Sequence, residues 1–169
     1  MIETAVLIGK EDGMAFIYDA EIRIHSVIEE LDDSGLPTGE PEVNINTVPG
    51  FLKYDRTSGD LTVSYVEHNE GERTLTDILL SDREVRLTRR GALTSDMIFR
   101  EGEESTSLYT VGPYSFDMKL NTKRIRSDLT KDGGELSLIY TMNVGGAGKA
   151  ARMKIRVTRK NAALTERGV

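Results

Sequence analysis

The sequence predicts an all-β protein: one antiparallel barrel of about 8 to 10 strands. Three observations lead to this prediction. From Gly91 onward, apolar residues fall at every second position in successive stretches, which is typical of strands with one buried face. Short polar turns separate these stretches, so neighbouring strands are expected to pair antiparallel. No stretch of about a dozen residues keeps the 3.6-residue period of a helix.

Strands are expected in the first half wherever apolar alternation lies between turn residues. The first strand places Ile22, Ile24 and Ile28 on one face and charged residues on the other. A polar loop, LDDSGLPTGEPE, follows it, and the turns DRTSGD, NEGE and SDRE separate the next strands. These signals predict strands at 20–30, 43–54, 61–68, 73–80 and 85–90.

The second half continues the same pattern. The turns are REGEE, VGP, TKDGG and GGAGK, and the strands are expected at 94–100, 105–111, 115–126, 135–144 and 152–159. The residues expected on the inner face are Met97, Phe99, Tyr109, Phe116, Met118, Leu120, Thr122, Leu136, Leu138, Tyr140, Met142, Met153, Ile155 and Val157. Charged residues alternate with them and are expected to face solvent.

A sheet of ten short strands has to cover its apolar face and its edges, and closure into a barrel does both. We therefore expect a barrel domain at 20–160, preceded by an N-terminal extension at 1–19 that contains a strand-like run, and followed by a frayed tail at 161–169. Helix is expected to be at most one turn, within 1–18 or the tail. Met14 is an alternative to Met1 as the initiator.

Composition limits the compartment and the chemistry. At 169 residues the chain suits a single domain, and it contains no cysteine, which excludes disulfides and thiolate metal sites. The N-terminus has neither a basic region nor an apolar run long enough for a signal peptide or a membrane span. We expect a cytoplasmic protein that does not engage membranes.

The net charge of −6 hides an asymmetry between the two halves. Residues 1–84 hold 6 Lys and Arg against 19 Asp and Glu, whereas residues 85–169 hold 16 against 9. One hypothesis is a basic outer strip that docks nucleic acid or an acidic protein. The alternative is that opposite charges pair across neighbouring strands. The residues of the strip are Arg86, Arg89, Arg90, Lys123, Arg124, Arg126, Arg152, Lys154, Arg156, Arg159 and Lys160.

The second half also carries a family resemblance. Its elements are a turn followed by TSDMIFREG, a tyrosine before GPYSF, the alternating FDMKLNT, and SDL before GELSLIYTMNVGG. Together they resemble the YwiB-like family of bacterial calycin-like β-barrel domains of unknown function. The resemblance covers roughly residues 20–160, and 1–19 precede the usual start of the family. It implies a fold of the kind used by lipocalins and fatty-acid-binding proteins, and it implies no activity or catalytic residues.

The sequence contains no motif for catalysis, a metal or a cofactor. MNVGGAGKA lacks the glycine and the Ser or Thr that a phosphate loop needs, and a strand-like run follows it where a helix would be required. His25 and His68 have no further ligands at metal-site spacing, and no GxSxG occurs. We therefore expect no enzyme activity, no metal and no cofactor.

Some polar residues share the parity of apolar neighbours on their strands. Ser26 falls between Ile24 and Ile28, Asp77 falls between leucines, and Arg124 continues the row of Phe116. If they face inward they need partners, because an unpaired buried polar group costs about 1 to 3 kcal/mol. In fatty-acid-binding barrels an inward arginine and a tyrosine hold the ligand carboxylate, and Arg124 is the candidate by analogy. The alternative is that Arg124 lies at a strand end and extends to water.

Two functional hypotheses follow. The first is a barrel that binds a small apolar or amphipathic anion in its interior, lined by Met97, Phe99, Tyr109, Phe116, Arg124, Tyr140 and Met142. The second is an interaction module with a filled barrel, whose basic strip docks nucleic acid or an acidic protein. Homodimerisation is compatible with either hypothesis, and no residue pattern identifies the surface that it would use.

Overall fold

The computed structural model describes residues 6–10 and 13–160, with side chains from Ala15 to Lys160. All of its regular structure is β. The strands are β1 (Val6–Lys10), β2 (Gly13–Leu31), β3 (Pro37–Asp55), β4 (Leu61–Asn69), β5 (Glu72–Ser81), β6 (Glu84–Gly91), β7 (Leu93–Phe99), β8 (Glu104–Val111), β9 (Tyr114–Ser127), β10 (Gly133–Val144) and β11 (Ala147–Arg159). Within the described residues there is no helix, and therefore none that could cross a membrane.

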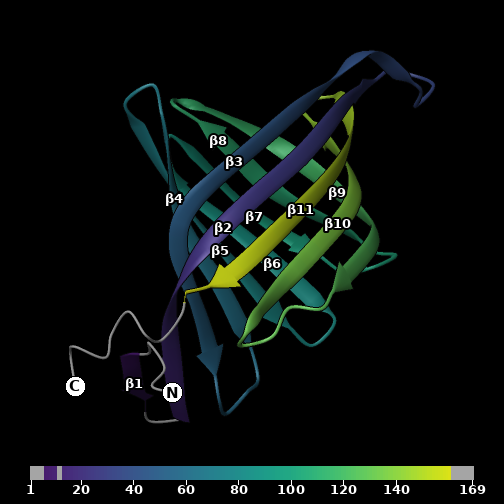
Figure 1. The fold of residues 1–169 in the computed structure, drawn as a ribbon. Helices are drawn as coiled ribbons and strands as arrows, with labels where there is room; N and C mark the ends of the chain where they lie inside the picture. Colours follow the sequence, from purple (N-terminus) through teal and green to yellow (C-terminus); the bar gives the residue numbers. More distant parts are fainter. Residues whose placement is uncertain (1–5, 11–12, 161–169) are drawn as a thin grey trace.

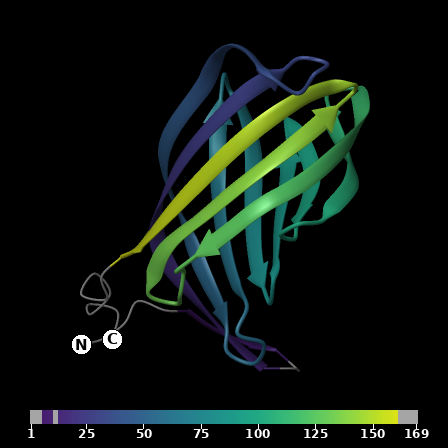
Figure 2. The ribbon, with the colours of Figure 1, turned by 90° about the vertical axis from the view of Figure 1, so that its right-hand side faces the viewer.

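The sheet is a closed antiparallel barrel of the ten strands β2 to β11 (Figure 1). Each strand pairs with the next in the chain, β11 pairs with β2, and β2 also pairs with β3. Strand β1 lies outside this circuit and pairs with the beginning of β2. Figure 2 shows the strands tilted steeply around the barrel, as closure of a sheet requires. The expected antiparallel barrel is confirmed.

The antiparallel order places successive turns at alternate ends. We name the end with the β2–β3, β4–β5, β6–β7, β8–β9 and β10–β11 turns the mouth, and the opposite end the base. The β2–β3 hairpin is the longest and projects beyond the rest of the barrel at the mouth (Figure 1).

All ten expected strands are present, and the first two are longer than expected. β2 begins at Gly13 and buries Ala15 and Tyr18, so residues 13–19 belong to the barrel. β3 begins at Pro37, within the predicted polar loop. The prediction failed there because backbone pairing continues past a bulge, with Glu30 opposite Thr38, and needs no apolar side chains. The predicted tail at 161–169 lies outside the described residues.

One hydrophobic core fills much of the interior. Phe99, Ile78, Leu87 and Leu138 are fully buried, and the Phe99 and Tyr140 rings meet edge to face with centroids 4.9 Å apart. On the outer face the alternating positions carry charged residues, as the sequence predicts. The side-chain alternation therefore assigns most residues correctly to the inside or the outside.

A β-bulge in β9 reverses this alternation. Thr122 pairs with Tyr140 and Arg124 pairs with Ile139, so Lys123 is an extra residue with no partner in the ladder. Before the bulge, Met118, Leu120 and Thr122 face inward; after it, Ile125 faces inward, opposite Leu138. Arg124 consequently lies exposed on the outer surface. The expectation that Arg124 faces the interior is wrong, because it assumed an unbroken period of two.

Truncation of one leucine on each face tests this assignment. Leu138→Ala removes a fully buried side chain and should lower the free energy of unfolding by about 2 to 5 kcal/mol, measured by urea denaturation. The matched control Leu108→Ala, at a leucine that is 60% exposed, should change it by less than about 0.5 kcal/mol. An equal loss of unfolding free energy in the two variants would contradict the assignment of Leu138 to the inner face and Leu108 to the outer face.

Candidate ligand-binding site

A row of polar side chains crosses the inner wall of the barrel. Tyr65 on β4 pairs with Thr76 on β5, Thr76 pairs with Arg89 on β6, and Arg89 pairs with Ser95 on β7. Each of the four has the inward parity of its strand, because the residues two positions away toward the base are buried and apolar. We call Tyr65, Thr76, Arg89 and Ser95 the polar row.

Arg89 is the charged member of the polar row. Its side chain follows Val85 and Leu87 on the inner face and is half-buried. Within residues 15–160, no carboxylate lies within ion-pair distance of its guanidinium. Removing a charge from water is costly unless the charge is paired. We therefore treat Arg89 as a candidate contact for a bound ligand.

Three buried hydroxyls face the same space. Ser95 Oγ and Thr122 Oγ1 have no hydrogen-bond partner among the described groups, and Thr76 Oγ1 lies beside the Tyr65 hydroxyl, to which a hydrogen bond lowers the pKa of Tyr65 against the effect of burial. Thr76 and Ser95 flank Arg89 on its two sides, and Thr122 pairs with Tyr140 across β9 and β10. An unsatisfied buried hydroxyl costs about 1 to 3 kcal/mol, and native structures contain few of them.

Two buried tyrosines complete the polar surroundings of Arg89. Burial raises the pKa of Tyr65 to about 12, and the positive charge of Arg89 opposes this increase. Burial also raises the pKa of Tyr140, and Arg89 again acts in the opposite direction. Both phenols therefore stay protonated at neutral pH and can donate hydrogen bonds to an acceptor beside Arg89.

The polar row lies between the apolar core and the mouth of the barrel. Toward the base, Ile78, Leu87 and Phe99 are fully buried. Toward the mouth, Tyr109 and Met142 are half-buried and pack against the core, and Phe116 is 41% exposed. The interior thus offers cationic and hydroxyl groups at its middle and apolar side chains at its entrance.

The residues predicted for the binding site fall into two groups inside the barrel and one exception outside it. Met97, Phe99 and Tyr140 are buried in the core, whereas Tyr109, Phe116 and Met142 line the mouth. Arg124 is on the outer surface, as described above. The assignment of Arg89 to the outer basic strip is wrong, because Arg89 pairs with the inward-facing Thr76 and Ser95. Its parity in VRLTRRG, two positions after Leu87, already indicated an inward side chain.

The other two polar candidates, Ser26 and Asp77, lie on opposite faces of the barrel wall. Ser26 has the inward parity and pairs with Met153. Asp77 does not face inward: its carboxylate accepts a hydrogen bond from Ser64 Oγ at 2.5 Å on the outer face, because Ile78 takes the inward position. The expectation of an inward Asp77 was ambiguous in the sequence because leucines and isoleucine occur at both parities in β5.

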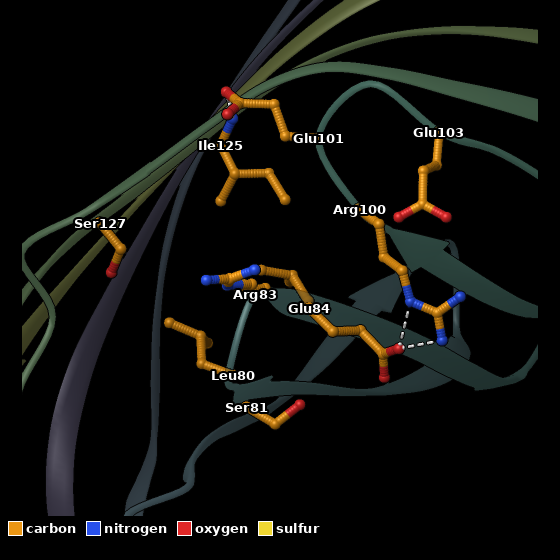
Figure 3. A pocket seen from close by; sticks show the side chains of 10 residues that line it. Leu80, Ser81, Arg83, Glu84, Arg100, Glu101, Glu103, Ile125 and Ser127 are labelled. Carbon is orange, nitrogen blue, oxygen red and sulfur yellow. Dashed lines mark hydrogen bonds and ion pairs between the residues drawn. The ribbon is translucent and has the colours of Figure 1, made fainter.

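A second polar region lies at the base of the barrel. A pocket of about 560 Å³ lies among the β5–β6 turn, the β7–β8 turn and β9 (Figure 3). Part of its charge has partners: Arg100 Nε donates to Glu84 Oε1 at 2.8 Å, and Glu101 accepts from the Ile125 backbone N–H at 3.1 Å. These contacts tie the turns together beside the bulge, so the polar row is the stronger candidate for a ligand.

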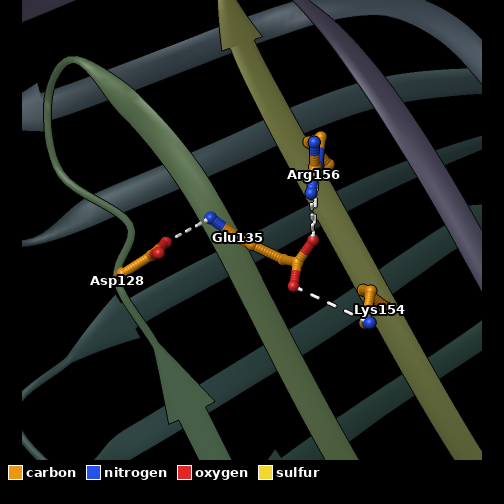
Figure 4. A network of polar contacts seen from close by, with 4 residues as sticks. All are labelled: Asp128, Glu135, Lys154 and Arg156. Atoms are coloured by element: carbon orange, nitrogen blue, oxygen red, sulfur yellow. Dashed lines mark hydrogen bonds and ion pairs between the residues drawn. The ribbon is translucent and has the colours of Figure 1, made fainter.

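The outer basic strip is partly paired. Glu135 on β10 accepts from Arg156 Nη2 at 3.0 Å and lies 3.9 Å from Lys154 Nζ (Figure 4). The Glu135 backbone N–H donates to Asp128 Oδ1 at 2.7 Å. Arg86 forms an ion pair with Asp96 across β6 and β7. Cross-strand pairing therefore accounts for part of the charge asymmetry.

The described residues contain no group of three His, Cys, Asp or Glu side chains that could hold a metal ion. His25 has outward parity on β2, and His68 is exposed at the end of β4. The geometry thus places the candidate chemistry in the lumen, on one arginine and a set of hydroxyls.

The fold and this site define a closed antiparallel β-barrel whose candidate binding site is its own interior. The chain belongs to the family described as a domain of unknown function, DUF1934, whose model matches residues 34–157. It is 31% identical over 124 residues to the uncharacterized beta-barrel protein YwiB of Bacillus subtilis, covering 73% of this chain and 81% of the relative. The crystal structure of the ywiB protein from B. subtilis matches with a TM-score of 0.73 at 27% identity, covering 86% and 94% of the two chains. The resemblance found in the sequence is confirmed.

The raised pKa of Tyr65 makes stability depend on pH in the alkaline range. Between about pH 10 and pH 12 the unfolded chain loses the Tyr65 proton and the folded chain keeps it, so the free energy of unfolding should fall as pH rises. A difference of two pKa units corresponds to a loss of about 3 kcal/mol. Tyr65→Phe should make this decline shallower in urea denaturation from pH 9 to pH 12.

Tyr114→Phe is the matched control, because Tyr114 is 67% exposed at the β8–β9 turn. It should leave the decline with pH unchanged, and in absorbance titration the late phenolate step, to which Tyr140 also contributes, should become smaller in Tyr65→Phe and stay the same in Tyr114→Phe. An early Tyr65 titration, near pH 10, would contradict its burial beside Arg89.

Proposed function

We propose that this protein is a non-enzymatic barrel that binds a small amphipathic anion in its lumen. The anionic group would contact Arg89 and neighbouring hydroxyls, and the apolar part would extend toward Tyr109, Phe116 and Met142 at the mouth. The observation that carries the proposal is the half-buried Arg89, which has no ion-pair partner within residues 15–160 and is flanked by the buried hydroxyls of Thr76 and Ser95.

The donor set favours an anion. Arg89 cannot lose its proton, and the Tyr65 and Tyr140 phenols remain protonated, so the groups around this position are predominantly donors. A carboxylate or phosphate could accept from several of them at once. Hydrogen bonds of this charge-assisted kind are about twice as strong as neutral ones.

The same set favours binding over catalysis. A nucleophile needs an adjacent base, and a general base needs a pKa near the working pH. The polar row provides a fixed cation, two hydroxyls and a tyrosine whose pKa is about 12. These groups can hold and orient a ligand, whereas none of them accepts a proton readily at neutral pH.

Two matched arginine variants test the proposal. With dodecanoate as the probe, Arg89→Gln should weaken binding by about 10-fold to 100-fold in calorimetry, because a charge-assisted bond is lost. Arg124→Gln removes the same charge from the outer face and should leave the affinity unchanged. Dodecanol, which lacks the charge, should bind weakly to the unmodified protein and equally weakly to Arg89→Gln.

The free protein provides an independent readout. Arg89→Gln should leave the free energy of unfolding equal or higher, because the arginine has no ion pair to lose within the described residues. Equal dodecanoate affinity in both variants would refute the site. The site would also be refuted if none of the probes (dodecanoate, dodecyl phosphate and aromatic carboxylates) bound to the protein.

A second candidate function rests on the outer basic strip. Arg23 on β2 lies directly opposite Arg156 on β11, and His25 lies opposite Lys154. The two arginines repel each other in this arrangement, and Glu135 is the carboxylate that lines their shared pocket of about 300 Å³. A phosphate-rich or acidic partner would relieve the repulsion. A labelled single-stranded oligonucleotide should then bind with an affinity that falls steeply as salt rises.

A further inference from the structure

The β2–β3 hairpin leaves one edge of β3 open. β3 pairs with β2 along its length, but it pairs with β4 only from Gly50 to Tyr54. From Pro37 to Pro49, the edge that faces away from β2 has no strand partner among the described residues. Figures 1 and 2 show this hairpin rising past the remaining strands. An edge of this kind presents free N–H and C=O groups to an added strand.

The two faces of the open edge differ in chemistry. Outward-facing Val43, Ile45 and Phe51 are apolar and 52%, 57% and 51% exposed. The inward parity carries Glu42, Asn44 and Asn46, and Asn46 Nδ2 donates to Glu67 Oε2 at 3.3 Å. A strand added beside β3 would therefore contact apolar side chains on one face and carboxylates on the other.

An apolar pocket lies at the end of this open edge that is nearer the base of the barrel. Its volume is about 530 Å³, and its lining includes Pro49, Phe51, Val66 and Leu75. It forms where β3 and β4 part above the Gly50–Tyr65 pair, so an added strand would end in it. The exposed Val43 and Ile45 and the pocket thus lie along the same edge of β3.

The charge of the hairpin selects the occupant. Residues 24–52 contain no lysine or arginine, and residues 29–42 contain six acids: Glu29, Glu30, Asp32, Asp33, Glu40 and Glu42. Parallel pairing of β3 with the β3 of a second copy would bring these acids together, which is unfavourable, whereas antiparallel pairing would leave the two acidic hairpin tips at opposite ends without a cationic partner. A cationic strand would instead be attracted. Pro41 and Pro49 lack an N–H and limit such pairing to the stretch between them.

We propose that the open edge of β3 between Pro41 and Pro49 is a docking site for an extended, cationic segment of a partner protein. The segment adds as a strand antiparallel to β3, with apolar residues beside Val43 and Ile45 and with lysine or arginine beside Glu42 and Glu67. An apolar residue near its amino end occupies the pocket at Phe51 and Leu75. This docking site does not require a ligand in the lumen, although Tyr65 of the polar row also lines its pocket.

The probe is a peptide of about ten residues, the length of a strand, with alternating lysine and valine and one phenylalanine near its amino end. It should bind the full-length protein in calorimetry and slow hydrogen exchange at the backbone amides of residues 42–48. Glu40→Lys combined with Glu42→Lys should weaken this binding by at least about tenfold, since attraction becomes repulsion.

The control variant combines Asp82→Lys with Glu103→Lys, which makes the same change of charge at exposed residues of the base. It should bind the peptide as the unmodified protein does. A peptide of the same composition with its lysines in one block should bind at least about tenfold more weakly, since it cannot present two different faces.

Four results would overturn the proposal. The first three are absence of peptide binding, equal affinity for the two peptides, and an equal loss of peptide affinity in the two charge variants. The fourth is that, without peptide, sedimentation shows self-association and hydrogen exchange shows protection of residues 42–48.

Discussion

Continuous backbone pairing around the closed sheet is the constraint on which the inside and the outside of this protein depend. β2 completes the circuit by pairing with β11 on one edge and β3 on the other. Because side chains alternate strictly along paired strands, closure assigns each one to the lumen or to solvent. Ile78, Leu87 and Phe99 enter the core by this assignment, and Arg89 is carried inward by the same periodicity.

One inserted residue changes the assignment locally. The bulge at Lys123 turns Arg124 outward and Ile125 inward, and Glu101 accepts a hydrogen bond from the Ile125 N–H released there. The distribution of arginines between the lumen and the surface is therefore decided by two backbone features, the unbroken parity of β6 and the broken parity of β9. The electrostatics of the interior follows, because Arg89 is the cation whose charge reaches Tyr65 and Tyr140.

The architecture could be predicted from the sequence because barrel strands in this chain alternate clearly and their turns carry glycine or acidic residues. The candidate site was predicted only in part. Phe99 and Tyr140 were placed inside correctly, and Tyr109, Phe116 and Met142 were on the right face but lie near the rim. Arg124 was assigned wrongly because a bulge leaves no local sequence signal. The length of β3 was underestimated because its ladder with β2 runs through polar residues and prolines.

The pairing of β11 with β2 also has a consequence for synthesis on the ribosome. Ala20 lies opposite Arg159, and Glu30 lies opposite Lys149, so the circuit joins segments from nearly opposite ends of the chain. Hairpins from β2 to β10 can form as they emerge, but the cylinder cannot close until the last strand has left the exit tunnel. Until that moment the nascent sheet has two unpaired edge strands, β2 and β10. β11 pairs with both, and its side chains Val157, Ile155 and Met153 become buried when it does so.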